Sequence, residues 1–147
     1  MAWSDLEEAA PKLADFGRNR FASGVAFLAT TKADGSPRVH PVTPIIGQGR
    51  QFLFMEPTSP KGADLRRDGR YALHSSVEDA SGGGGEFLGE GTAKSVDDRR
   101  SRSLAEQSAS YEPADKYVLF ELTVKRVLST TYHESGRAQR VRWLSGS

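Results

Sequence analysis

Three prolines in a short strand-like segment most constrain what this chain can fold into. They are Pro37, Pro41 and Pro44, all within residues 37–46. Proline has no backbone N–H, so this segment cannot pair along its whole length on both sides. It must lie at the edge of a sheet or border a split between strands. The Asp34-Gly35 dipeptide before it is typical of a tight hairpin, which predicts antiparallel pairing with the apolar strand at residues 25–31.

The rest of the chain alternates strand-like runs with a few helical segments. Further strands are predicted at residues 51–56, 70–76, 86–96 and 118–125, with a last hairpin around residues 135–136 that leads to residues 141–144. Helices are predicted at residues 4–24, with a kink at Pro11, at residues 59–68, and at residues 97–110 on the surface. The 147 residues suit one domain, residues 1–147, that is mainly β with short helices. Six or so antiparallel strands in this order indicate a small barrel.

Charge and composition exclude several classes of site. The 20 Lys and Arg balance 19 Asp and Glu, which argues against a dedicated nucleic-acid binder, although arginines cluster at residues 99–102 and 137–142. The chain has no cysteine, and its three histidines have no metal-ligand spacing, so neither disulfides nor a metal site is expected. No leader peptide is visible, and no apolar run approaches the roughly 20 residues of a membrane span. We expect a cytoplasmic protein without a membrane partner.

A candidate phosphate site follows the third strand. Ser59 can cap the next helix, Pro60 suits its first position, and Lys61 adds a cation beside free amides that already favour an anion. Arg38 and His40 are two residues apart, so they share one face of the preceding strand. If that face lies next to the helix start, one pocket holds a phosphomonoester. We call this set the phosphate site: Arg38, His40, Thr58, Ser59 and Lys61.

Several runs of the sequence resemble a known family in their order and spacing. They are residues 27–31, Ala33-Asp34-Gly35, residues 37–42, Ser59-Pro60-Lys61, Asp64-Leu65 and residues 67–70. Together they are similar to the FMN-binding split barrel of the pyridoxamine 5'-phosphate oxidase-like superfamily, over residues 21–127. The resemblance implies a six- to seven-stranded antiparallel split β-barrel. It also implies a homodimer that binds two flavins at the subunit interface.

The resemblance further implies which residues contact the cofactor. Val42, Thr43, Met55 and Glu56 would line the flavin ring. Trp143 is either a plain terminal anchor or an aromatic lid over the flavin of the partner subunit. The full expected set is Arg38, Val39, His40, Pro41, Val42, Thr43, Met55, Glu56, Thr58, Ser59, Lys61 and Trp143. No side chain is expected to act as a catalytic acid, because a flavin supplies the redox chemistry.

The expected activity is electron transfer through FMN to a small planar acceptor. The chain ends without the terminal segment that binds pyridoxal phosphate in the namesake enzymes, so vitamin B6 oxidation is not expected. Two alternatives stay open: a deazaflavin in place of FMN, or a non-catalytic protein that holds flavin, haem or another tetrapyrrole. In the haem alternative, His40 or His74 would be an axial ligand. The glycines at residues 82–85 predict a mobile loop without a packed conformation.

Overall fold

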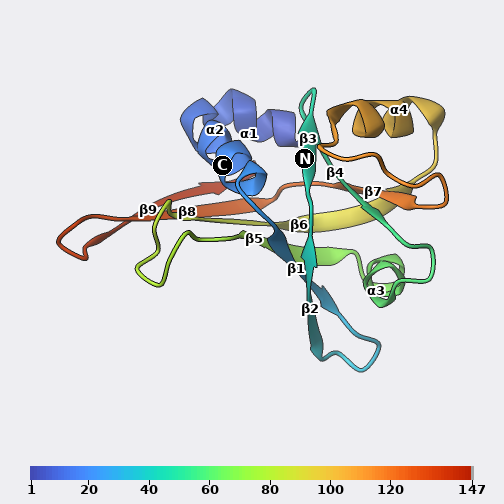
Figure 1. The fold of residues 1–147 in the computed structure, drawn as a ribbon, viewed down its shortest axis with the longest axis horizontal. Coiled ribbons are helices and arrows are strands. Elements are labelled where there is room, and N and C mark those ends of the chain that lie inside the picture. Colours follow the sequence, from blue (N-terminus) through green and yellow to red (C-terminus); the bar gives the residue numbers. More distant parts are fainter. Residues whose placement is uncertain (147) are drawn as a thin grey trace.

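A computed structural model describes residues 1–146, in which four helices surround a nine-stranded sheet (Figure 1). The helices are α1 (Trp3–Ala9), α2 (Pro11–Ala22), α3 (Pro60–Arg67) and α4 (Arg99–Ser108). The strands are β1 (Ala26–Thr31), β2 (Pro37–Val42), β3 (Ile45–Gly47), β4 (Arg50–Met55), β5 (Arg70–Ser75), β6 (Glu86–Val96), β7 (Val118–Leu122), β8 (Arg126–Tyr132) and β9 (Ala138–Leu144). None of the helices in this part of the chain is long and apolar enough to cross a membrane.

The order of the strands shows how the sheet closes. Seven strands follow the order β2-β1-β5-β6-β7-β4-β3, while β8 joins β6 and β9 joins β8, and every pairing is antiparallel. Strands β2 and β3 stand at opposite ends of this order, yet only Thr43 and Pro44 separate them in the chain. That link reaches about 11 Å, whereas six strand spacings span about 29 Å. The sheet must therefore curl until its ends meet, which confirms the predicted antiparallel split barrel.

The proline-rich segment differs in one respect from the sequence prediction. A single strand at residues 37–46 was expected, but the backbone leaves the β conformation at Thr43 and Pro44 and forms two separate strands. Within the described chain, β2 pairs with β1 alone and β3 with β4 alone, so both are edge strands as predicted. The Asp34-Gly35 turn also forms, with Gly35 at a φ of 88°, a value that glycine adopts without strain.

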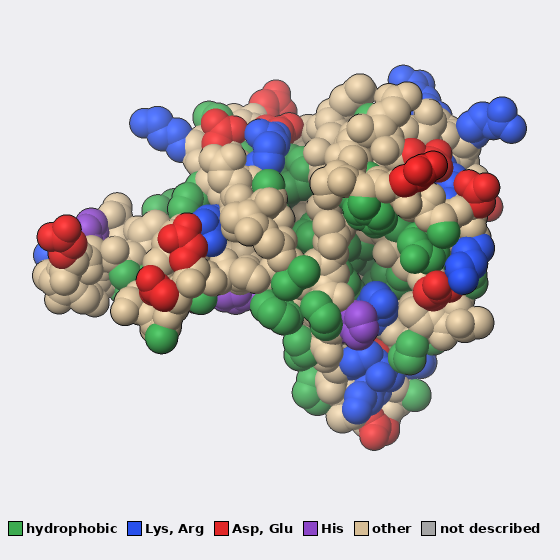
Figure 2. All heavy atoms as spheres, in the orientation of Figure 1, with side chains coloured by type: hydrophobic (Ala, Val, Ile, Leu, Met, Phe, Trp, Pro, Cys, Tyr) green, Lys and Arg blue, Asp and Glu red, His purple; other side chains and the backbone are tan. Residues whose placement is uncertain are grey.

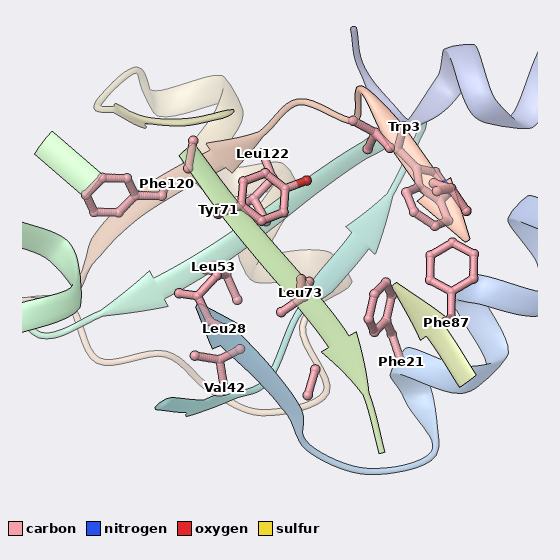
Figure 3. Close-up of a cluster of buried hydrophobic side chains, with 14 of the residues drawn as sticks. Trp3, Phe21, Leu28, Val42, Leu53, Tyr71, Leu73, Phe87, Phe120 and Leu122 are labelled. Carbon is pink, nitrogen blue, oxygen red and sulfur yellow. The ribbon is translucent and has the colours of Figure 1, made fainter. Parts of the chain in front are cut away.

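Aromatic side chains hold the first two helices against the sheet (Figure 3). Trp3 of α1 and Phe21 of α2 both contact Phe87 of β6, with ring centroids 5.9 and 5.3 Å apart. Gly17 allows this approach, because a Cβ atom there would lie 2.5 Å from the Phe87 ring. The predicted helix at residues 4–24 is in fact two helices that meet at Ala10, which agrees with the expected effect of Pro11.

Helix α4 covers a second, smaller core. It was expected to lie on the surface with Asp97 as its cap, but Asp98 caps it, and Ala105 is 0% exposed. This helix packs on β3, β4 and β7, where Leu119 and Phe54 are buried. Strand β7 therefore contributes to both hydrophobic clusters: Leu119 lies in the smaller one, and Phe120 and Leu122 lie in the main one.

The glycine-rich loop between β5 and β6 has a defined backbone, contrary to the expectation of no packed conformation. The Glu78 amide donates to the Gly83 carbonyl at 2.8 Å, and the Gly85 amide donates to the Gly82 carbonyl at 2.9 Å. The Asp79 carboxylate accepts from the amides of Ser81 and Gly83. These hydrogen bonds use glycines in the positive φ region to fold the loop onto itself.

Candidate phosphate-binding site

The first turn of α3 forms as the sequence predicts. Ser59 is the N-cap residue, and its hydroxyl accepts a hydrogen bond of 3.2 Å from the Gly62 amide. Pro60 occupies the first helical position, where its missing N–H costs nothing. The Gly62 and Ala63 amides are used by Ser59, so the Lys61 amide is the one N–H of this first turn without a partner among the described residues. The partial positive charge of the helix start favours a bound anion.

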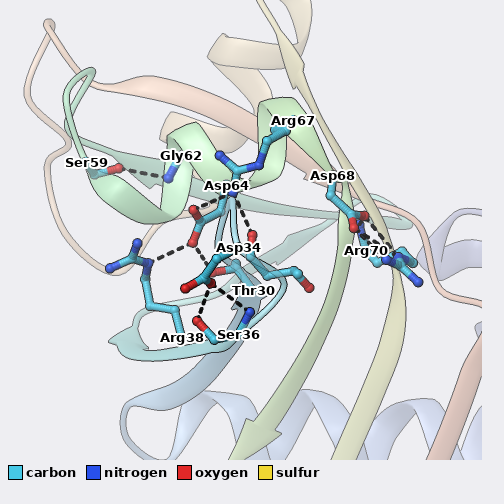
Figure 4. A network of polar contacts seen from close by, with 11 residues as sticks. Thr30, Asp34, Ser36, Arg38, Ser59, Gly62, Asp64, Arg67, Asp68 and Arg70 are labelled. Carbon is cyan, nitrogen blue, oxygen red and sulfur yellow. Dashed lines mark hydrogen bonds and ion pairs between the residues drawn. The ribbon is translucent and has the colours of Figure 1, made fainter.

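A buried carboxylate joins α3 to the β1–β2 hairpin (Figure 4). Asp64 is 3% exposed, and its two oxygens accept three side-chain hydrogen bonds. Arg38 Nε and Thr30 Oγ1 donate to Oδ2 at 2.7 and 2.8 Å. Arg67 Nη2 donates to Oδ1 at 2.9 Å. The helix is thereby fastened to the hairpin that carries Arg38.

These contacts determine the charge of the Asp64 side chain. Burial alone would raise the pKa of the carboxyl group, because the ionised form is poorly solvated there. Hydrogen bonds from Arg38, Thr30 and Arg67 outweigh burial and lower the pKa to about 2. Asp64 is therefore ionised at neutral pH. Two arginines face one carboxylate, which leaves the cluster with a net positive charge.

Lys61 adds a second cationic group at the start of α3. Burial lowers the pKa of its ammonium, and the Glu56 carboxylate opposes that shift. Glu56 is itself paired with Lys116 at 3.3 Å, whereas Lys61 has no ion pair among residues 1–146. Figure 2 shows Lys and Arg side chains gathered, with a histidine among them, over the part of the molecule where β2 and α3 lie.

The other two members of the phosphate site are His40, two residues after Arg38, and Thr58, just before Ser59. His40 and Thr58 are exposed. His40 shares the face of β2 with Arg38, and its Nδ1 lies 2.8 Å from the Pro41 carbonyl oxygen. The contact between β2 and α3 runs through Arg38 and Asp64, in the middle of the helix, so the approach of β2 to the helix start stays a prediction.

The residues expected around the flavin ring divide between the core and the surface. Val42 and Met55 belong to the main core, so their side chains offer little open surface. Thr43 and Glu56 are exposed. Polar contact with a ring at this position would therefore come from Thr43, Glu56 and the backbone.

Three other expected contacts lie away from the phosphate site within one chain. Val39 and Pro41 are exposed on the opposite face of β2 from Arg38. Trp143 lies in β9, which pairs only with β8 in the described chain, on the far side of the molecule from α3 (Figure 1). Val39 and Pro41 are thus open to a partner subunit, whereas Trp143 is half-buried and packs against the main core of its own chain.

Thr30, Asp64 and Arg67 complete the cluster, and the sequence reasoning gave none of them a role. Two signals were available: Thr30 is a polar residue in a mostly apolar strand, and Asp64 is an acid two residues before the arginines that end a short helix. Both patterns are common, so only the fold identifies them as partners of Arg38.

Comparison with known proteins supports this architecture. A family model described as pyridoxamine 5'-phosphate oxidase matches residues 11–131. No curated protein matches the sequence. Among solved structures, a heme binding protein from Mycobacterium smegmatis is similar with a TM-score of 0.67 and 21% identity, over 88% of this chain and 57% of that chain.

Two further solved structures share the fold over most of their length. PhzG from Burkholderia lata, solved with tetrahydrophenazine-1-carboxylic acid, gives a TM-score of 0.64 and 16% identity, over 94% of this chain and 84% of that chain. A NimC/NimA family protein from Clostridium acetobutylicum gives a TM-score of 0.63 and 17% identity, over 97% of this chain and 94% of that chain. At these identities the structures establish the fold and nothing more. The family match spans most of the sequence, and the chain therefore belongs to the pyridoxamine 5'-phosphate oxidase family of split-barrel proteins.

Proposed function

We propose that this protein is a flavin-dependent oxidoreductase that holds FMN by its phosphate and reduces a small planar acceptor. The observation that carries the proposal is the gathering of Arg38, Lys61 and the capped start of α3 at one edge of the barrel. A phosphomonoester carries up to two negative charges, and this edge offers cations together with the unpaired amide of Lys61 at the helix start.

The donors at the site fit such a group. Arg38 uses Nε on Asp64, and its terminal nitrogens have no hydrogen-bond partner among the described residues. Lys61 is likewise unpaired there and partly buried, which strengthens its attraction to an anion. When bound, FMN supplies the electron-transfer chemistry. The chain's own residues bind and orient the phosphate.

The protein is further proposed to act as a homodimer. One row of directly paired residues crosses the outer face of the sheet: Pro41, Phe27, His74, Leu88, Leu128 and Arg142. Phe27 is 42% exposed and the neighbouring Val39 is 65% exposed. A groove of about 450 Å³ continues this face past Leu88 and Leu128 to Trp143. A second copy that covers this face would bury apolar surface.

A double substitution on this outer face tests the dimer. Phe27→Asp combined with Val39→Asp places charges in the apolar face, so light scattering should change from a dimer mass to the 16.0 kDa of one chain. Glu134→Gln at the exposed β8–β9 turn is the control and should stay dimeric. A wild-type mass of one chain at micromolar concentration with FMN bound would contradict the dimer.

Identification of the bound small molecule tests the cofactor assignment. FMN, a deazaflavin and haem have different absorption spectra, and each has a characteristic mass after release by denaturation. We expect FMN, reducible under anaerobic conditions and reoxidised by a quinone or a similar planar acceptor in stopped-flow absorbance. Reduced protein that passes electrons to no member of a broad acceptor panel would contradict the enzyme assignment.

Haem binding is a second candidate because one ring nitrogen of His40 is unpaired within the described chain. Its Nδ1 lies against a carbonyl oxygen, which leaves Nε2 without a partner in residues 1–146 and free to bind iron. His74 is a poorer ligand, since its ring nitrogens contact the Ser75 carbonyl at 2.6 Å and Glu86 at 3.3 Å. Haem titration of wild type and His40→Ala decides this: a Soret shift that disappears in the variant would favour haem over FMN.

A further inference from the structure

The ion pair between Asp64 and Arg38 uses only part of the arginine side chain. It accepts from Arg38 through Nε alone, although a guanidinium can bind one carboxylate through two nitrogens at once. The side-on contact leaves both terminal nitrogens of Arg38 pointing away from Asp64, and Figure 4 shows them on the side of the molecule where Ser59 and Gly62 begin α3.

We propose that Asp64 is a positioning residue that holds the guanidinium of Arg38 in the orientation required to bind a cofactor phosphate. This inference rests on the proposed function, since it concerns a residue that contacts Arg38 of the same phosphate site. Asp64 does not contact the phosphate; it acts through Arg38. The chemical class of ligand is a terminal phosphate monoester such as that of FMN.

Asp64 is itself held in place from three directions. Thr30 Oγ1 occupies the same oxygen as Arg38, and Arg67 occupies the other. Thr30 stands directly opposite Arg38 in the β1–β2 pairing, and Arg67 also donates to the Thr31 carbonyl at 2.8 Å. A buried carboxylate with all these partners cannot rotate freely. It therefore removes rotational freedom from Arg38, a long side chain that would otherwise lose this freedom only on binding the phosphate.

The opposite effect is also physically reasonable, which makes the inference testable. A carboxylate next to a phosphate site repels the phosphate. If repulsion dominates, neutral Asn at position 64 strengthens phosphate binding; if positioning dominates, it weakens binding. The sign of the change in affinity thus separates the two effects.

The test compares FMN with riboflavin, which lacks the phosphate, by isothermal titration of four proteins: wild type, Asp64→Asn, Arg38→Met and the double variant. The ratio of the two affinities isolates the phosphate contribution. We expect Asp64→Asn to lower this ratio about three- to tenfold, less than the loss of a direct contact with the phosphate, because Asp64 acts only through Arg38. In the Arg38→Met background the same substitution should have no further effect.

The controls separate failure of this inference from failure of the proposed function. Asp68→Asn breaks the ion pair with Arg70 at the other end of α3 and should leave the ratio unchanged. If wild type shows no preference for FMN over riboflavin, the phosphate site itself is wrong and the inference falls with it. If wild type prefers FMN but Asp64→Asn keeps or raises that preference, the positioning role alone is overturned.

A second variant covers the case in which Asp64→Asn does not fold. Thr30→Val removes one hydrogen bond from Asp64 and keeps every charge of the cluster. We expect it to lower the FMN-to-riboflavin ratio about twofold, with a cooperative thermal unfolding transition as the check of folding. An unchanged ratio in folded Thr30→Val would overturn the positioning role.

Discussion

Asp64 in the middle of α3 and Asp68 at its C-terminal end have similar pKa values for different reasons. Burial opposes ionisation of Asp64, and three hydrogen bonds overcome it to bring its pKa to about 2. Asp68 is half-buried at the surface, and hydrogen bonds from Arg70 two residues away lower its pKa to about 2 as well. Asp64 joins two strands and a helix, whereas Asp68 has local partners only.

The difference shows why a lowered pKa alone does not identify a functional site. At Asp68 the ion pair lies at the surface, where solvent and salt screen it. At Asp64 the same kind of pair is buried and fixes the side chain of Arg38 next to the helix start. Burial and long-range partners, and not the size of the pKa shift, distinguish the end of α3 that can bind a ligand.

Truncation of the two aspartates should give the largest contrast. Asp64→Ala leaves two arginines without their partner and is expected to lower the free energy of unfolding by about 2–3 kcal/mol. Asp68→Ala should cause no measurable loss, because its ion pair is exposed. Urea denaturation of both variants measures this. Equal losses would remove the distinction between the two ends of the helix.

Removal of Lys61 should act on binding and not on folding. Lys61→Ala takes away an unpaired, partly buried ammonium and is expected to weaken FMN affinity about ten- to a hundredfold. The matched control is Lys116→Ala, which removes the nearby lysine that pairs with Glu56. Isothermal titration should show a change for Lys61 alone, and wild-type affinity in Lys61→Ala would exclude it from the site.

Acid should weaken the buried cluster in a defined range of pH. The pKa of Asp64 is lower in the folded protein than the ordinary value of 3.8, so its contribution to stability is complete above about pH 4 and is lost as pH falls toward 2. We expect this contribution to be on the order of 1–2 kcal/mol. Asp64→Asn should remove that part of the pH dependence in urea unfolding between pH 2 and 5. A variant with the wild-type slope would show that Asp64 does not titrate as described.

Loss of the N-cap should have the smallest effect. Ser59→Ala removes the acceptor for the Gly62 amide and is expected to cost about 1 kcal/mol of stability. Ser59→Asp is the comparison, since it restores a cap but adds a negative charge where the phosphate is expected. If Ser59→Asp recovers stability yet binds FMN more weakly than Ser59→Ala, the helix start serves both folding and binding.

The sequence predicted local features of this molecule well. The Asp34-Gly35 hairpin, the Ser59 cap and the edge position of β2 follow from the chemistry of single residues or dipeptides. Each depends on neighbours in the chain, where turn and cap preferences are strong. The resemblance to the split-barrel family then added the overall topology.

Features that join distant segments were not predicted. The break at Thr43 and Pro44 exists because the curled sheet must pass from one edge to the other. The prolines indicated an edge or a split, but not which residues make the crossing. The contact between Asp64 and Thr30 links residues that are 34 positions apart. Such partners depend on the packing of α3 against β1 and β2, which only the folded chain reveals.

Nuclear magnetic resonance of labelled protein tests the central claim most directly, because it locates the phosphate on the molecule. Addition of FMN to ¹⁵N-labelled protein should shift the backbone amide of Gly62 and the side-chain Nε–H of Arg38, while riboflavin should leave both signals nearly unchanged. The Asp68→Asn variant should show the same pattern of shifts. FMN-dependent shifts that miss both groups and appear instead around the glycine-rich loop or Trp143 would contradict a phosphate site at the start of α3.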